Sequence, residues 1–353
     1  MSIQKLLTST IDVSSLTSDD DGKRVAVDAN NTLAVIASDS PLFIPPKFTY
    51  TGSVAGYTAG GRAPPTMYNT IDKFPFSSDT NATDVGDLTI SRNYYVGQSS
   101  TTHGYETGGL TSGSQETQKF PFSSDQNATG DLFDLSLKRY GGVGCSSETH
   151  GYHAGGYGVP GEPVTGAVNI IDKFPFSSDT NATDVGDLTQ VIAEAGAGFS
   201  FDGTAYAAGG SPASDVINRW STVSDGNATD VGELVVAVNG GSGSSSGTHG
   251  YHCGGDDGSN SRDEISKFSF TSNSPATDIA ELSRSVSFAG GGTSSTTSGY
   301  SVGGRFRPSP VAAGTDIIDK FPFSSDSPAS DIGNLTVARI EIASNQSGIT
   351  PIA

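Results

Sequence analysis

The five histidines are the residues of this chain that could most readily hold a metal ion. Three of them stand in copies of the segment THGY, at residues 102–105, 149–152 and 248–251, and two of these copies continue to a second histidine. A metal site needs two or three such ligands at one point in space. The copies lie far apart in the chain, and residues three apart on a strand face opposite sides of it. We therefore interpret THGY as a turn between two strands and predict no metal site there.

The acidic segment SSDTNATD at residues 77–84 could also bind a metal, because Asp79, Asn81 and Asp84 could supply oxygen ligands to calcium. Calcium loops usually add a glycine and a closing bidentate carboxylate, and one copy of the segment, SSDQNATG, has no counterpart of Asp84. Asp and Asn also favour turns by bonding to their own backbone. We predict a structural turn and no cofactor, with calcium as the alternative. We also interpret the four Asn-Ala-Thr sequons as copies of this turn, at Asn81, Asn127, Asn181 and Asn227.

These segments recur because the chain is built from a repeat. The nineteen residues at 71–89 return unchanged at 171–189. A Gly-Gly pair preceded by a tyrosine occurs six times, with a mean period of about 49 residues. The pairs are Gly60-Gly61, Gly108-Gly109, Gly155-Gly156, Gly209-Gly210, Gly254-Gly255 and Gly303-Gly304, and their tyrosines are Tyr57, Tyr105, Tyr152, Tyr206, Tyr251 and Tyr300. A basic residue followed by an aromatic one, and then a leucine, complete each period.

Each period contains four short strand-like segments separated by turn residues. In the second period these are TISRNYYVG, HGYETGG, ETQKFPF and a short element around DLFDL. No segment keeps the 3.6-residue apolar period of a helix. Four strands in a period of about fifty residues are typical of a propeller blade, and we predict an all-β, six-bladed β-propeller. The glycine pairs would let the blades converge near the axis, and the aromatic residues would fill the widening space between blades.

Tyrosine-containing strands that end in Gly-Gly, followed by an aromatic strand at a period near fifty, resemble kelch repeats. The repeat segments GYxxGG, IDKFPFSSDxNATDVGDLT and SSxTHGY are similar to kelch-like repeats in virion structural proteins of tailed phages of marine cyanobacteria. The resemblance covers roughly residues 52–353. It departs from a kelch repeat in that tryptophan usually precedes the fourth strand there, and only Trp220 represents it here. The resemblance implies a virion protein that is made in the host cytoplasm and is present as an oligomer or in many copies on the particle.

The two ends of the repeat region predict a closed propeller. The segment SPLFIPPKFTYTG, before the first Gly-Gly pair, does not match the first-strand pattern, whereas residues 336–339 align with residues 89–92. We therefore expect the C-terminal segment to supply the first strand of the first blade, which removes open sheet edges. Residues 46–353 form the predicted propeller. Residues 1–45 are predicted to form a small β arm, with KRVAVDANNTLAVIAS as a hairpin and DSPLFIPP as a stiff linker.

The charge of the chain excludes some partners. Lys and Arg number 19 against 38 Asp and Glu, a formal charge of −19, and without a basic stripe we expect no nucleic-acid partner. The N-terminal segment MSIQKLLTST has no long apolar stretch, so we expect neither a signal peptide nor membrane insertion. Cys145 and Cys253 have no CxxC spacing and are predicted to be buried free thiols.

The sequence gives little support for a catalytic function. Copper-radical oxidases with a kelch-like fold need a cysteine crosslinked to tyrosine and two histidines, and neither cysteine falls where the repeat would place such a set. Propeller sialidases need an arginine triad, and arginine is scarce here. There is no G-x-S-x-G or Walker sequence. A pair of catalytic carboxylates is not visible in a sequence, so a glycan-processing enzyme is the alternative, beside a bacterial interaction scaffold.

The loops that follow the Gly-Gly pairs vary in length between copies, and binding residues concentrate on loops held by a rigid scaffold. Aromatic residues and arginines are the usual anchors of interfaces. The candidate binding residues are Met67, Tyr68, Tyr157, Arg305, Phe306 and Arg307. We expect a non-catalytic phage protein whose arm docks on other virion proteins and whose propeller face binds a partner protein or a host-surface glycan. The sequence leaves its place on the particle open between tail fibre, tail tip and head decoration.

Overall fold

The computed structural model describes residues 24–27, 33–36, 50–110, 115–159, 164–193, 196–287, 291–306 and 314–349. No residue in these ranges is helical, and their regular structure consists of 30 strands, which confirms the all-β prediction. The chain divides after residue 47 into two compact units. Each unit is described by itself.

A β-hairpin is the described part of the smaller unit. Strand β1 (Arg24–Val27) pairs antiparallel with β2 (Leu33–Ile36), and the register joins Arg24 to Ile36 and Val27 to Leu33. This pairing confirms the hairpin predicted from KRVAVDANNTLAVIAS. The rest of residues 1–45, including the predicted linker, lies outside the described residues.

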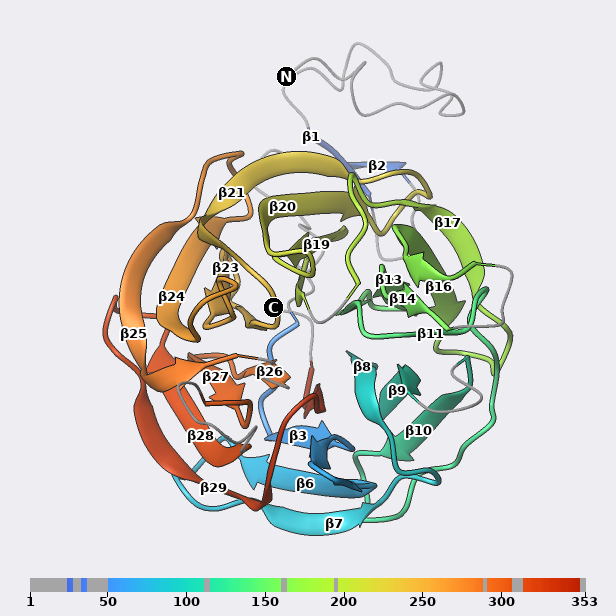
Figure 1. Cartoon of the computed structure of the whole chain (residues 1–353). Coiled ribbons are helices and arrows are strands. Elements are labelled where there is room, and N and C mark those ends of the chain that lie inside the picture. Colours follow the sequence, from blue (N-terminus) through green and yellow to red (C-terminus); the bar gives the residue numbers. More distant parts are fainter. Residues whose placement is uncertain are drawn as a thin grey trace. The chain divides into compact units, whose positions relative to one another are not determined.

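The larger unit consists mainly of antiparallel sheets, which stand about a common axis in Figure 1. We number six of them; five have four strands and sheet II has three, an arrangement consistent with a β-propeller. Sheet I contains β30 (Ala343–Ser347), β3 (Ala55–Ala59), β6 (Thr70–Pro75) and β7 (Thr83–Asp87). Sheet II contains β8 (Asn93–Ser99), β9 (His103–Leu110) and β10 (Thr117–Pro121). Sheet III contains β12 (Val143–Ser146), β13 (His150–Ala154), β16 (Ile170–Pro175) and β17 (Thr183–Asp187).

The remaining three numbered sheets repeat this order from the axis outward. Sheet IV contains β18 (Ala197–Phe201), β19 (Thr204–Ala208), β20 (Ser214–Ser221) and β21 (Thr229–Val238). Sheet V contains β22 (Ser242–Ser245), β23 (His249–Cys253), β24 (Arg262–Ser269) and β25 (Thr277–Val286). Sheet VI contains β26 (Gly291–Ser294), β27 (Ser298–Val302), β28 (Thr315–Pro322) and β29 (Ser330–Arg339). Two small sheets join β4 (Arg62–Ala63) to β5 (Thr66–Met67), and β11 (Arg139–Tyr140) to β14 (Tyr157–Gly158) and β15 (Gly166–Ala167).

Sheet II differs from the prediction, because no fourth strand forms around DLFDL. Single bridges take its place, between Lys119 and Thr129 and between Glu116 and Asp134. The repeat is shortened here, from NATDVGDL to NATGDL. Asp131, which follows the glycine, has a φ of 55°, so the chain leaves the extended conformation where the other copies continue as a strand.

The first strand of each sheet lies nearest the axis, as Figure 1 shows for β8 and β26. Contacts run from each of these inner strands to the next, in the order β8, β12, β18, β22, β26, β30 and back to β8. Strand β30 is also the antiparallel neighbour of β3, in a register from Ala55 with Ser347 to Ala59 with Ala343. The C-terminal segment therefore supplies the inner strand of sheet I, as the sequence predicted.

The inner strands come closest to one another at one small residue each. These residues are Gly97, Gly144, Gly198, Gly243, Gly292 and, in β30, Ser344. A Cβ atom on Gly144 would lie 2.1 Å from the carbonyl oxygen of Gly97, and one on Gly292 would lie 1.9 Å from that of Gly243. Carbon cannot approach backbone oxygen so closely, so a side chain at either position would push two sheets apart.

Hydrogen bonds join neighbouring inner strands at the residue two positions after each axial glycine. The backbone N–H of Ser99 donates to Ser146 Oγ at 3.0 Å, and that of Ser146 donates to Ser200 Oγ at 3.0 Å. The N–H of Ser245 likewise donates to Ser294 Oγ at 2.8 Å. Because neighbouring inner strands belong to different sheets, these side chains satisfy backbone groups that no strand ladder reaches.

The Gly-Gly pairs lie at the ends of the second strands. All twelve of these glycines have positive φ, for example 65° at Gly60 and 92° at Gly61. The N–H of Gly61 donates to the carbonyl of Arg92 at 2.9 Å, in the link to sheet II. The predicted sharp exit from the strand is therefore confirmed. The expectation that these pairs form the close approach at the axis is wrong, because the single glycines of the inner strands form it.

Aromatic side chains fill the space between neighbouring sheets, as predicted. Each second-strand tyrosine packs on aromatic residues of the next sheet, with ring centroids 4.9 to 6.4 Å apart. The contacts are Tyr57 with Phe120 and Phe122, Tyr105 with Phe174 and Phe176, Tyr152 with Trp220, Tyr206 with Phe268 and Phe270, Tyr251 with Phe321 and Phe323, and Tyr300 with Phe74 and Phe76. Each such pair contributes about 0.5–1.5 kcal/mol beyond the burial of its area.

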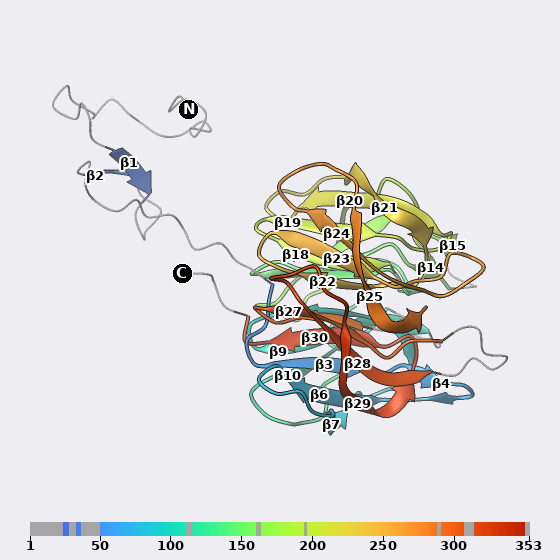
Figure 2. The same ribbon diagram turned by 90° about the vertical axis from the view of Figure 1, so that its left-hand side faces the viewer.

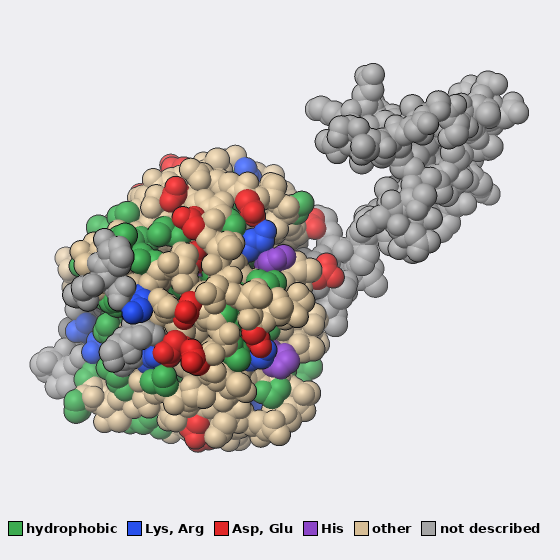
Figure 3. Space-filling view, turned by 90° about the vertical axis from the view of Figure 1, so that its right-hand side faces the viewer, with side chains coloured by type: hydrophobic (Ala, Val, Ile, Leu, Met, Phe, Trp, Pro, Cys, Tyr) green, Lys and Arg blue, Asp and Glu red, His purple; other side chains and the backbone are tan. Residues whose placement is uncertain are grey.

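Polar contacts join the same sheets nearer the rim, where basic and acidic side chains neighbour one another in Figure 3. The third-strand basic residue of each sheet reaches the acidic turn of the next, as Lys73 with Asp125, Lys119 with Asp179, Lys173 with Asp225, Arg219 with Asn273, Lys267 with Asp326 and Lys320 with Asp79. The turn also bonds to the preceding outer strand, since Asn127 Oδ1 accepts from the N–H of Asp87 at 3.0 Å. The ion pairs are partly exposed, so each contributes at most about 1 kcal/mol.

Removing residues 336–353 should expose the edge of β3, because β30 is its hydrogen-bonded neighbour. We expect the shortened chain to aggregate and to lose the cooperative thermal transition of the intact chain. Removing residues 350–353 leaves β30 whole and is the control, which should melt like the intact chain. Calorimetry and size-exclusion chromatography measure both. A 336–353 deletion that stays monomeric and melts normally would contradict the pairing.

Candidate binding site at the axial cavity

The larger unit has two different faces. Because neighbouring strands are antiparallel, the turns from first to second and from third to fourth strand lie on one side, which we call the turn face. The loops from second to third strand and the links to the next sheet lie on the other side, which we call the loop face. In Figure 2, β4, β14 and β15, all within loops of this kind, lie on the same side of the unit.

The THGY segments form turns on the turn face. His103 Nδ1 lies 2.9 Å from Thr102 Oγ1, and the backbone N–H of His103 donates to Ser100 Oγ at 2.9 Å. The copies at His150 and His249 make the same two contacts. The prediction of a repeated turn is therefore confirmed, and each of these histidines serves the turn of its own sheet.

The second histidine of each HGYH segment is buried on the opposite side of its strand. His153 Nδ1 lies 2.8 Å from Thr107 Oγ1, and its Nε2 lies 2.9 Å from the carbonyl oxygen of Gly141. Burial, helped by the charge of Arg139, lowers the pKa of His153 well below its usual range. Burial alone lowers the pKa of His252 to about 4. Both rings are therefore neutral in the folded chain near pH 7.

The acidic turns use their oxygen atoms within the fold. Asp79 accepts from Lys320 Nζ at 2.8 Å, and Asn81 Oδ1 accepts from the N–H of Asn334 at 3.1 Å. Asp84 Oδ1 accepts from the N–H of Gly86 at 3.2 Å. No group of three His, Cys, Asp or Glu side chains suited to a metal ion occurs among the described residues. The repeated acidic turn is thus explained by contacts between sheets.

The two cysteines are buried and form no disulfide, as predicted. Burial raises the pKa of the Cys145 thiol to about 12 and raises that of Cys253 above its usual range. Neither thiol is therefore ionised near pH 7, and neither can act there as a thiolate nucleophile.

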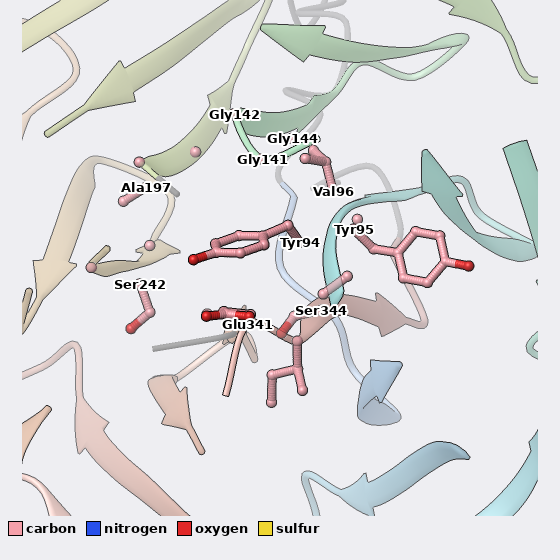
Figure 4. A pocket seen from close by; sticks show the side chains of 18 residues that line it. Tyr94, Tyr95, Val96, Gly141, Gly142, Gly144, Ala197, Ser242, Glu341 and Ser344 are labelled. Atoms are coloured by element: carbon pink, nitrogen blue, oxygen red, sulfur yellow. The ribbon is translucent and has the colours of Figure 1, made fainter. Parts of the chain in front are cut away.

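A cavity of about 100 Å³ lies on the axis at the loop face. Nine of its 18 lining residues are glycines, so backbone groups form much of its wall. In Figure 4 the side chains of Tyr94 and Glu341 lie next to each other beside the cavity, with Ser242 across from them. A second cavity, of about 70 Å³, lies on the other side of the axial glycines and is lined by Tyr50 and by polar residues such as Gln346.

Tyr94 and Glu341 have an unusual backbone conformation. Their φ angles are 57° and 58°, in the left-handed region that side chains disfavour. The two other links of the same length have glycine at this position, with φ of 67° at Gly141 and 72° at Gly240. The two residues are joined directly, because the N–H of Tyr94 donates to the carbonyl of Glu341 at 3.0 Å. Two non-glycine residues thus hold a glycine conformation beside one cavity.

The Glu341 carboxylate is buried and charge-compensated. Arg62 Nη2 donates to Oε1 at 2.7 Å, and Arg62 Nε lies 2.6 Å from Oε2. Asn93 Nδ2 also donates to Oε2. The hydrogen bond to Glu341 raises the pKa of Arg62 above its usual value. The paired charges give this wall of the cavity polar groups without a net charge.

A row of three tyrosines leads outward from the cavity across the loop face. The rings of Tyr94 and Tyr140 have centroids 5.6 Å apart, and those of Tyr140 and Tyr157 lie 5.5 Å apart. Tyr140 and Tyr157 are register partners in the small sheet of β11 and β14. Tyr94 is only 9% exposed, whereas the other two are half-buried, so the row runs from the cavity to the surface.

The predicted binding residues that the structure describes all lie in loops of the loop face. These are Met67 and Tyr68 in sheet I, Tyr157 in sheet III, and Arg305 and Phe306 in sheet VI. Arg307 lies outside the described residues. Tyr157 belongs to the tyrosine row, whereas the other four come from two other sheets and do not line the cavity.

Four residues of the site were missed by the sequence reasoning, namely Arg62, Tyr94, Tyr140 and Glu341. A signal for two of them was present, because an alignment of the links places Tyr94 and Glu341 where the two other links of the same length have glycine. Arg62 directly follows a Gly-Gly pair, as Tyr157 does, and Tyr140 directly precedes Gly141, but the residue type at both positions differs between copies, so no shared residue marks them.

No protein-family model and no curated protein matches the chain. No helix in the described part of the chain has the length and hydropathy needed to span a membrane. The function is therefore argued from the site.

Replacing His252 by glutamine should make the fold more resistant to acid. The unfolded chain binds a proton at this side chain below about pH 6.5, whereas the folded chain does so only near its pKa of about 4. Stability therefore falls as the pH drops through this window, by on the order of 2 kcal/mol at about pH 5. Urea unfolding of the variant should show less loss between about pH 7 and 5.

The control is His249→Gln, because His249 lies in a partly exposed turn and should change the acid response less. An unchanged pH dependence in His252→Gln would contradict the buried neutral state of this ring.

Proposed function

We propose that the larger unit is a six-bladed kelch-like propeller closed by its C-terminal strand. The contacts from each inner strand to the next, returning from β30 to β8, support this count. The aromatic contacts support it independently, since they pass through six tyrosines and return from Tyr300 to Phe74 in sheet I. A closed ring leaves no sheet edge free at the junction of the two chain ends.

We propose further that the chain is a non-catalytic structural or attachment protein of a phage particle. Its N-terminal arm, residues 1–45, would dock on other virion proteins, and its loop face would bind a host-surface glycan or a partner protein. The virion assignment rests on the repeat segments, which are similar to those of phage virion proteins. The observation that supports the division of roles between the arm and the loop face is the opposite placement of the two cavities. The chain enters the propeller at Tyr50, which lines the turn-face cavity, whereas Tyr94 and Glu341 line the loop-face cavity.

The lining of the loop-face cavity favours binding over catalysis. Glycoside hydrolysis generally uses two carboxyl groups on either side of the scissile bond. The described lining of this cavity contains one carboxylate, Glu341, and both of its oxygen atoms are within reach of Arg62. A carboxylate held in this way can orient a ligand but lacks the partner that the hydrolytic mechanism requires. Tyr94 and the tyrosine row instead offer a surface on which a ligand can rest.

The charge of the chain supports the same choice of partner. A net charge of −19 disfavours nucleic acids and anionic surfaces. Among the described residues that face the viewer in Figure 3, acidic and basic side chains are interspersed, and no basic patch forms there. An uncharged glycan or a protein surface fits this distribution better than a phosphate-rich partner.

Two measurements test the proposed function. The full chain, applied to an array of surface glycans, should bind at least one of them without releasing a product, because a lone paired carboxylate cannot support hydrolysis. Density-gradient-purified phage particles that encode the chain should contain its peptides in structural amounts by mass spectrometry. Release of sugar would contradict the non-catalytic role, and absence from purified particles would contradict the virion assignment.

A further inference from the structure

We propose that the loop-face cavity binds one residue of a neutral oligosaccharide against Tyr94, with the following residues along Tyr140 and Tyr157. This inference rests on the proposed function, because it names the class of glycan that the loop face would take and the side chains that hold it. Four independent properties of the site support it, namely strain, charge, polar groups and size.

The backbone strain marks Tyr94 and Glu341 as residues kept for their side chains. A non-glycine residue in the left-handed region costs on the order of 1–2 kcal/mol. Glycine would avoid that cost, and Gly141 and Gly240 stand at the equivalent positions of other links. Both strained residues line the same cavity and are hydrogen-bonded to each other. Strain of this kind persists where the side chain serves a function.

The charge of the site selects a neutral ligand. Arg62 compensates the Glu341 carboxylate, so the pair presents hydrogen-bonding groups without a net charge. An anionic ligand would be repelled by a chain with a charge of −19. A cation would meet one carboxylate that is already paired. A neutral ligand with many hydroxyl groups therefore fits the electrostatics best.

The wall of the cavity supplies the polar groups that such a ligand needs. Glycine backbone N–H and C=O groups line it, together with the hydroxyl of Ser242. A hydroxyl both donates and accepts hydrogen bonds, so a sugar ring can match a wall that contains both kinds of group. The Tyr94 ring offers an apolar face to the C–H groups of the sugar.

The volume of the cavity limits how much of an oligosaccharide can enter it. Its volume of about 100 Å³ is several times the roughly 10–15 Å³ that one water molecule needs. It can thus take one ring or part of a ring, and further residues must continue outside it. The tyrosine row begins at the cavity and ends at the half-buried Tyr157, which provides that path.

The test compares three variants of the full chain on an array of neutral and anionic oligosaccharides. The intact chain should bind neutral glycans, and Tyr94→Gly should weaken that binding by about tenfold or more, as loss of a central aromatic anchor does. Tyr94→Gly relieves the left-handed strain but removes a largely buried ring that packs on Tyr140, so its thermal transition should fall, and binding is compared at a temperature at which both chains are folded. The control Val223→Ala, at an 84% exposed residue of the turn face, should bind like the intact chain.

The variant Glu341→Gln gives a second readout that a merely structural role would not produce. It keeps the shape of the side chain but leaves the Arg62 charge uncompensated, so preference should shift from neutral toward anionic glycans. This variant also keeps the proposal testable if Tyr94→Gly does not fold.

The outcomes distinguish a failure of this inference from a failure of the proposed glycan-binding function. If the intact chain binds neutral glycans and Tyr94→Gly and Glu341→Gln bind them equally well, the cavity is the wrong site and the glycan-binding function stands. If the intact chain binds only anionic glycans, the ligand class is wrong. If it binds no glycan at all, both this inference and the glycan-binding part of the proposed function are overturned.

Discussion

The close approach of the inner strands is the constraint on which the rest of the structure depends. At the axis a backbone carbonyl occupies the place where the neighbouring Gly144 or Gly292 would carry a side chain. Sheets that meet so closely on one side must diverge toward the rim. The tyrosine and phenylalanine layer fills the first part of the diverging space, and the lysine–aspartate contacts span the part nearer the surface. The repeated nineteen-residue segment therefore encodes the contacts that join one sheet to the next.

Because the repeated residues make the contacts between sheets, the links and loops can differ in sequence from one sheet to the next. Tyr94 and Glu341 break the repeat at a position where the backbone favours glycine, and they do so in adjacent links beside one cavity. Tyr140 and Tyr157 extend the site through a pairing that recurs in sheets I, V and VI as single bridges but joins two tyrosines in sheet III. The scaffold is thus symmetric in its contacts between sheets and asymmetric at its loop-face cavity, which is the arrangement that a specific binding site on a repeat fold requires.

Local patterns made much of the fold predictable. The sharp turns at Gly-Gly, the hairpin at residues 24–36 and the role of the tyrosines follow from signals within single periods. The axial glycines were missed, although each of the five precedes a serine by two residues, because the Gly-Gly pairs were expected to form the close approach at the axis. The site was missed because it depends on backbone φ and on residues far apart in sequence, such as Asn93 and Glu341. Only Tyr157 was predicted, since a loop aromatic can be recognised without its partners.

A crystal structure of the full chain, grown with a neutral oligosaccharide in large excess, would test the account most directly. We expect one sugar ring in the loop-face cavity, in contact with Tyr94 and within hydrogen-bonding distance of the glycine-lined wall, and further rings along Tyr140 and Tyr157. An oligosaccharide bound at another place on the propeller while the cavity stays free of it would contradict the account.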